Sequence, residues 1–152
     1  MRGRSFALPL VLLAALVSSC STAKKDNSED WNKLQGRWKV EQALKSGKPM
    51  GTGIAYVEVQ GDEMNRITTE GVAHRRIRID ALAVPPTMDF EILDEKDKGH
   101  VMMGIYKFEK EKLWLCHSPV GKPRPAAFKS TPDDGNVMAI LRPLSERTYE
   151  KD

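Results

Sequence analysis

The sequence predicts an all-β protein built as one eight-stranded antiparallel barrel, and three observations support this fold class. The chain has 152 residues, of which 40% are hydrophobic and 30% charged, a composition that suits one globular domain. Beyond residue 31 the apolar residues alternate with polar ones in short runs, which is the period of strands and not of helices. Turn residues separate consecutive runs in chain order, as in a series of hairpins.

The expected elements follow each other closely along the chain. Gly61-Asp62 and Glu70-Gly71 lie between alternating runs and favour tight hairpin turns. Pro85-Pro86 excludes a regular central strand at that point. The only helix candidate is a short turn over 28–34 that Ser28 is placed to cap. The eight expected strands are 37–44, 54–60, 63–69, 72–80, 87–93, 101–109, 112–117 and 136–142, the last of which follows a connection of 18 residues with four prolines.

Closure of these strands into a barrel is the preferred arrangement. Strands of about seven residues span about 23 Å, which is enough for a small up-and-down barrel. Closure also removes exposed sheet edges. A two-sheet sandwich fits the number of strands almost as well, but the hairpins in chain order favour the barrel.

The amino terminus has the pattern of a secretory signal. Arg2 and Arg4 precede a charge-free apolar run over 6–17, which is shorter than the roughly 20 residues needed to cross a bilayer. The following Val17-Ser18-Ser19-Cys20 resembles the bacterial lipobox, which implies cleavage before Cys20 and lipid on its thiol. An ordinary cleaved signal is the alternative.

This interpretation divides the chain into a signal peptide over 1–19, a flexible tether over 20–30, a barrel over 31–146 and a tail over 147–152. We expect an exported protein held in the cell envelope by Cys20, at the outer membrane because Ser21 and not aspartate follows the cysteine. Cleavage removes two arginines and no acidic residue, so the net charge falls from +3 to +1. With no basic block beyond Lys24-Lys25, nucleic acid is not an expected partner.

Several motifs carry a resemblance to a known family. Gly36-Arg37-Trp38 resembles the Gly-x-Trp signature of lipocalins, in which the tryptophan closes the barrel base and stacks under a basic residue of the last strand, here Arg142. Over about 31–144 the chain resembles the lipocalin-like domain of uncharacterised function that is abundant in planctomycetes, through Leu34-Gln35-Gly36-Arg37-Trp38-Lys39-Val40, Gly47-Lys48-Pro49, Gly104-Ile105-Tyr106-Lys107, Leu113-Trp114-Leu115-Cys116 and Gly121-Lys122-Pro123-Arg124-Pro125 with Phe128. The resemblance implies a lipocalin-like barrel, often exported, with no established activity and no catalytic residues. Glu109-Lys110-Glu111-Lys112 departs from the Gly-Asp type of turn found there.

No catalytic, cofactor or metal site is predicted. Cys116 and His117 are neighbours on an expected strand, so their side chains point to opposite faces and cannot form an activated pair. His74 and His100 do not stand with His117 at a ligand spacing on one element. We therefore expect a packed core thiol at Cys116, solvated histidines and no enzyme activity.

Binding residues are easier to nominate. Soft and aromatic side chains either fill the barrel or line a cavity for one small apolar ligand, and the candidates are Phe90, Met102, Met103, Trp114 and Met138. Lys122 and Arg124 lie in a stiff basic loop that could meet a protein partner. On the strand over 72–80, Arg76 and Arg78 share the face opposite Arg75, Ile77 and Ile79, where they are either solvated or face an acidic partner.

These observations predict a lipid-anchored envelope protein that binds a small apolar ligand or another envelope component without enzyme activity. The alternative is a structural or protein-interaction module whose barrel is filled and takes no ligand.

Overall fold

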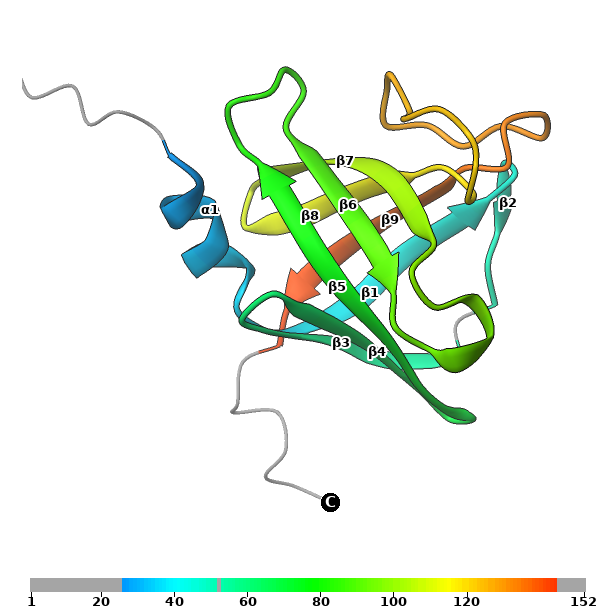
Figure 1. The fold of residues 1–152 in the computed structure, drawn as a ribbon, viewed down its shortest axis with the longest axis horizontal. Coiled ribbons are helices and arrows are strands. Elements are labelled where there is room, and N and C mark those ends of the chain that lie inside the picture. The colour runs from blue at the N-terminus through cyan, green and yellow to red at the C-terminus, as the bar shows by residue number, and fades with distance from the viewer. Residues whose placement is uncertain (1–25, 52, 145–152) are drawn as a thin grey trace, which may run out of the picture.

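The computed structural model describes residues 26–51 and 53–144, which form a closed antiparallel barrel (Figure 1). Around the barrel the strands follow chain order, and the last strand pairs with the first. This confirms the predicted all-β, eight-stranded architecture. The barrel strands are β1 (Gly36–Lys45), β3 (Ile54–Gln60), β4 (Glu63–Thr68), β5 (Gly71–Asp80), β6 (Thr87–Ile92), β7 (Val101–Glu109), β8 (Lys112–His117) and β9 (Val137–Pro143).

Strand β1 closes the barrel unevenly. It pairs with β9 from Trp38 to Lys45, with a register shift between Val40 and Gln42. On its other edge it meets β3 only from Gly36 to Trp38. The two-residue strand β2 (Lys48–Pro49) pairs with the far part of that edge, inside a segment expected to be a loop. The seam between β1 and β3 is therefore short, and it widens toward the end of the barrel at which β1 finishes.

Helix α1 (Asn27–Leu34) packs against the end of the barrel where β1 begins, which we call the plugged end. The side chain of Asn27 donates to the Ile79 carbonyl and accepts from the Ala81 amide, at the turn after β5. The side chain of Gln35 likewise donates to the Gly61 carbonyl and accepts from the Gly61 amide, in the turn after β3. The helix therefore joins two hairpin turns and covers this end of the barrel.

Two expectations about this segment are corrected. Asp26, and not Ser28, caps the helix: its carboxylate accepts from the Ser28 amide at 2.8 Å, which leaves Ser28 inside the first turn. Residues 27–30, expected in the tether, form the first half of α1, because Asp30 is buried and accepts a hydrogen bond from the Tyr106 hydroxyl at 2.5 Å. The signal peptide, residues 20–25 of the expected tether and the tail lie outside the described residues, and Cys20 is among them.

The core fills the plugged half of the barrel. Inward side chains of all eight barrel strands form one cluster with Leu34 of the helix, and the indole of Trp38 donates to the Leu34 carbonyl at 2.8 Å. Figure 1 shows α1 beside this end of the barrel, with the β8–β9 connection beside the opposite end. The most deeply buried members of this cluster are Leu34, Ile77, Met88, Tyr106, Leu113 and Leu141.

A second, smaller core lies outside the barrel wall. Ile105, Cys116 and Met138 point outward from β7, β8 and β9 and pack with Phe128 of the long β8–β9 connection. The wall formed by β7 to β9 is therefore apolar on both of its faces, because the connection covers the outer one.

Candidate functional site

A cavity of about 80 Å³, partly open to solvent, lies inside the barrel at the end opposite α1, which we call the far end. Its floor is the edge of the main core, and its rim includes Met50 and Ile54 beside the widened seam between β1 and β3. The cavity is thus the part of the interior that the core leaves unfilled. It is lined by Val40, Ala43, Met50, Ile54, Val57, Met64, Arg66, Arg75, Phe90, Leu115, His117, Val137, Ala139 and Leu141.

The lining is apolar except for three side chains. Arg66 on β4 and Arg75 on β5 point inward, as do Met64 and Ile77 on the same faces of these strands. His117, the last residue of β8, points inward with Leu113 and Leu115. Two guanidinium groups and one imidazole therefore lie within an otherwise hydrophobic space.

Both arginines are half-buried, and each has one buried donor, Nε, without a partner among the described residues. Within these residues neither side chain forms a salt bridge. Burial, helped by the charge of Arg66, lowers the pKa of Arg75 from 12.5 to about 10, so Arg75 is charged at neutral pH. A charged group that is partly desolvated and has a buried donor without a partner is costly, and such groups concentrate at functional sites.

His117 is neutral at pH 7. Burial lowers its pKa from 6.5 to about 4, and the positive charges of Arg75 and Arg66 act in the same direction. Its Nδ1 lies 3.2 Å from the Ser118 carbonyl, so Nδ1 carries the proton and Nε2 is an acceptor. The positive charge of the cavity therefore comes from the arginines and not from the histidine.

Gly104 on β7 allows the strands around His117 to approach closely. A Cβ atom at this position would lie 2.8 Å from the Met88 carbonyl oxygen and 2.9 Å from that of Cys116. The rings of Phe90 and His117, on the two strands that flank β7, pack with their centroids 5.3 Å apart. The glycine thus helps to shape the cavity wall formed by β6 and β8.

The predicted cavity residues divide between the two faces of the wall. Phe90 lines the cavity. Met102 belongs to the main core but does not line the cavity. Met103, Trp114 and Met138 point outward, so their assignment to a cavity was wrong. Met138 belongs to the outer core, and the Trp114 ring lies under the Lys107 ammonium group, 4.6 Å from it. The error has a physical cause, because the outer face of β7 to β9 is itself covered.

The expected stacking of Arg142 on Trp38 is also wrong. Trp38 is buried at the plugged end and packs against Phe108, with ring centroids 6.4 Å apart. Arg142 lies opposite Lys39 in the register and points outward, where its Nε is 3.5 Å from Glu41. Strand alternation places Arg142 and Trp38 on opposite sides of the barrel wall.

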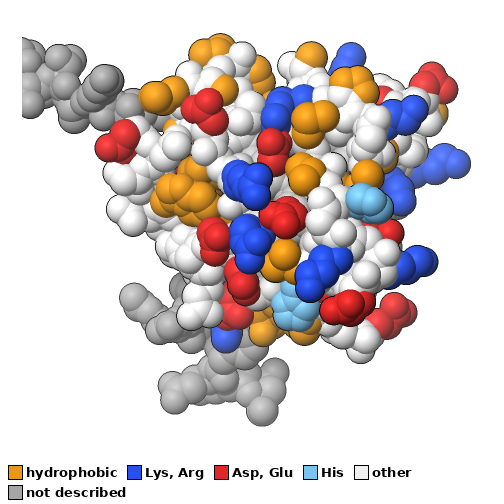
Figure 2. Space-filling model, viewed as in Figure 1, with side chains coloured by type: hydrophobic (Ala, Val, Ile, Leu, Met, Phe, Trp, Pro, Cys, Tyr) orange, Lys and Arg blue, Asp and Glu red, His pale blue; other side chains and the backbone are white. Residues whose placement is uncertain are grey.

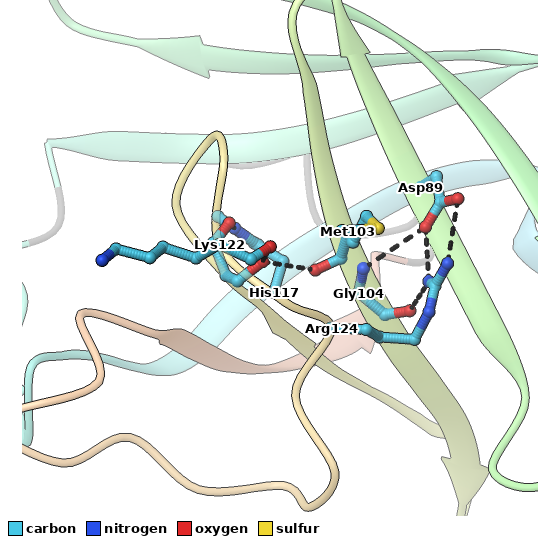
Figure 3. A network of polar contacts seen from close by, with 7 residues as sticks. Asp89, Met103, Gly104, His117, Lys122 and Arg124 are labelled. Atoms are coloured by element: carbon cyan, nitrogen blue, oxygen red, sulfur yellow. Dashed lines mark hydrogen bonds and ion pairs between the residues drawn. The ribbon is translucent and has the colours of Figure 1, made fainter.

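The basic loop between β8 and β9 is held in place by one of its own predicted partner residues. Figure 3 shows Arg124 reaching Asp89 on β6 and the Gly104 carbonyl on β7, and its Nη2 lies 3.1 Å from Asp89 Oδ2. Ser118 donates to the carbonyl oxygens of Met103 and Lys122. Arg124 therefore holds the loop against β6 and β7 through contacts within the chain, whereas Lys122 is exposed.

The outer arginines of β5 meet acidic groups of the same chain. Arg76 lies 3.4 Å from Asp62 and 3.7 Å from Glu91, and Arg78 lies 3.2 Å from Glu91. Figure 2 shows basic and acidic side chains alternating across this face. Such exposed pairs contribute little to stability, and they leave this face without a large field of one sign.

Cys116 is a buried thiol of the outer core. Burial raises its pKa, which disfavours the thiolate that a nucleophile requires, and its Sγ donates to the Lys129 carbonyl at 3.3 Å. Within residues 26–51 and 53–144, no group of three or more histidine, cysteine or acidic side chains is placed to hold a metal ion. The same residues contain no helix with the length and apolar character to cross a membrane.

Comparisons with protein-family models, with curated proteins and with solved structures found no match for this chain.

Sequence reasoning missed Arg66, Arg75 and His117 as site residues. One signal was present, since Arg75 shares its strand face with Ile77 and Ile79, and two isoleucines on a face mark the interior. His117 likewise shares a face with Leu113 and Leu115. A charged or titratable residue on an apolar face is therefore the pattern that would have pointed to this cavity.

Proposed function

We propose that the protein is a non-enzymatic binding protein that takes up a small, largely apolar ligand in the far end of its barrel. The observation that carries this proposal is the unequal filling of the barrel, in which one half holds a dense core closed by α1 and the other half holds the cavity. Concave, mostly apolar spaces with a few polar groups are the usual form of ligand sites. The size of the cavity, about 80 Å³, suits part of a small molecule and not a large one.

A cavity-filling substitution tests the proposal. Ala139 lines the cavity, so Ala139→Phe would occupy part of its volume, whereas Ala126→Phe in the exposed connection is a matched control. Uptake of the neutral dye Nile red would be measured by fluorescence, and native mass spectrometry would detect a molecule that copurifies from the native host. We expect binding by the native and control proteins and its loss in Ala139→Phe.

Absence of binding in the native protein would refute the proposal and favour the structural or interaction module. Equal dye uptake by all three proteins would show that the dye binds outside the cavity, and this result would also contradict the proposal. Val137→Phe, at the start of β9, serves as a second cavity-filling variant if Ala139→Phe does not give a folded protein by circular dichroism.

We also propose that Cys20 carries lipid and holds the barrel at a membrane of the cell envelope. Seven residue steps separate Cys20 from Asn27, which allows a reach of at most about 25 Å. Asn27 lies at the plugged end, next to the turn where Leu82 and Val84 expose apolar side chains. A lipid at Cys20 would therefore hold the plugged end near the membrane and turn the cavity toward the aqueous compartment.

Metabolic labelling with a palmitate analogue and membrane fractionation test this anchor. We expect label and membrane association in the native protein and neither in Cys20→Ser. Cys116→Ser is the matched control, because Cys116 is buried and is expected to have no part in lipidation. An unlabelled native protein in the soluble fraction would refute the anchor without affecting the proposal for the cavity.

A further inference from the structure

We propose that the cavity recognises its ligand through one anionic group, such as a carboxylate, which Arg66 and Arg75 bind together. This inference rests on the proposed ligand-binding function and adds the chemical class of the ligand. The expected ligand is amphipathic, with its anionic group at the arginines and its apolar part against the hydrophobic lining.

The register of the sheet brings the two arginines together. Arg66 on β4 lies opposite Ala73 on β5, and Arg75 lies two residues further along β5, on the same face. Residues in this diagonal relation are about 7–8 Å apart at the backbone, within reach of long side chains. One small anion can therefore contact both guanidinium groups.

Among the described residues, no carboxylate forms a salt bridge with either arginine. Both Nε atoms are buried without a hydrogen-bond partner among the described residues, although a guanidinium group has five N–H donors in a fixed fork. Asp94 is the carboxylate whose charge acts on Arg75, but its oxygens accept from the His74 amide at 3.2 Å and it forms no salt bridge with Arg75. A carboxylate in the cavity would accept hydrogen bonds from both guanidinium groups. Hydrogen bonds between charged groups of this kind are stronger than those between neutral groups.

The rest of the lining defines the apolar part of the ligand. Val40, Ala43, Ile54, Val137 and Ala139 present aliphatic side chains from β1, β3 and β9, and of these three strands only β3 pairs with a strand that carries one of the arginines. His117 is neutral and bonded to the Ser118 carbonyl, so it adds no charge that would favour a dianion over a monoanion. The cavity therefore suits a monoanion with a short aliphatic chain.

A matched pair of probes tests the inference with the purified full-length protein. Hexanoate and hexan-1-ol share the same chain length and differ in charge, and both would be titrated while the Nε–Hε resonances of the arginines are followed by NMR. We expect hexanoate to bind at least tenfold more tightly than hexan-1-ol and to shift the resonances of Arg66 and Arg75. Arg66→Met or Arg75→Met should weaken hexanoate binding at least tenfold and leave hexan-1-ol unchanged.

Arg76→Met is the control, since Arg76 is adjacent in sequence but points outward to Asp62 and Glu91. It should bind both probes like the native protein. Equal affinity of the native protein for the two probes would overturn the anionic class and leave the ligand-binding function standing. Binding of neither probe, together with failure to take up the neutral dye, would overturn both. The resonance shifts in the native protein decide the matter if a variant does not fold.

Discussion

Replacing Arg75 by methionine should make the protein more stable. Arg75 is half-buried with its Nε in the apolar cavity, and burial together with the charge of Arg66 lowers its pKa from 12.5 to about 10. At 1.36 kcal/mol for each pKa unit, this difference corresponds to a cost of about 3 kcal/mol for keeping the charged group in the folded protein. Methionine retains most of the aliphatic stem and removes the charge. We expect Arg75→Met to raise the free energy of unfolding by about 1–3 kcal/mol.

Urea unfolding at pH 7, followed by tryptophan fluorescence and circular dichroism, measures this change. The midpoint should move to higher urea without a change in the slope of the transition, since the surface exposed on unfolding is nearly the same. Arg76→Met is again the control, because its partly exposed ion pairs are each worth about 0–1 kcal/mol. A loss of stability in Arg75→Met, with no change in the control, would refute the reasoning, because it would show that the buried charge is compensated in the folded protein.

Three further predictions concern the core and the barrel wall. Tyr106→Phe removes the hydrogen bond to buried Asp30, so it should cost about 1–3 kcal/mol and speed amide hydrogen exchange in α1. Gly104→Ala places a Cβ atom 2.8 Å from a backbone oxygen and should cost about 1–3 kcal/mol by thermal unfolding, whereas Gly51→Ala, with no atom within 4 Å, should cost less than 1. His117 has its pKa lowered from 6.5 to about 4, so the stability due to the neutral ring is present above pH 6.5 and should fall by about 2 kcal/mol between pH 7 and pH 5, a loss absent from His117→Gln.

The fold could be predicted because its determinants are local. Alternation with a period of two, together with turn residues at Gly61 and Gly71, placed the barrel strands close to their final bounds. The strand β2 was missed because two residues are too few to show a period. The capping residue was misplaced by two positions, since Asp26 and Ser28 are equally suited to the role by type and only the geometry of the turn separates them.

The site was harder to predict, because hydrophobicity does not identify the inner face of the wall formed by β7 to β9. On β8 the outward Trp114 and Cys116 are as apolar as the inward Leu113 and Leu115, since the connection after β8 covers the outer face. A search for soft and aromatic residues therefore selected members of both faces. Which face is inside depends on contacts between residues far apart in sequence, such as Phe128 with the outer core.

The two ends of the barrel differ in how their buried polar groups are paired. At the plugged end the buried polar groups are paired, as Asp30 is with Tyr106 and the Trp38 indole is with the Leu34 carbonyl. At the far end Arg66 and Arg75 have buried donors without partners. Buried donors without partners could in principle lie at either end of the barrel. In this protein they lie at the end where the core leaves space and the seam between β1 and β3 is wide. That coincidence is what a ligand that supplies the missing negative charge requires, and it is why Arg75→Met should gain stability and lose hexanoate binding in the same protein.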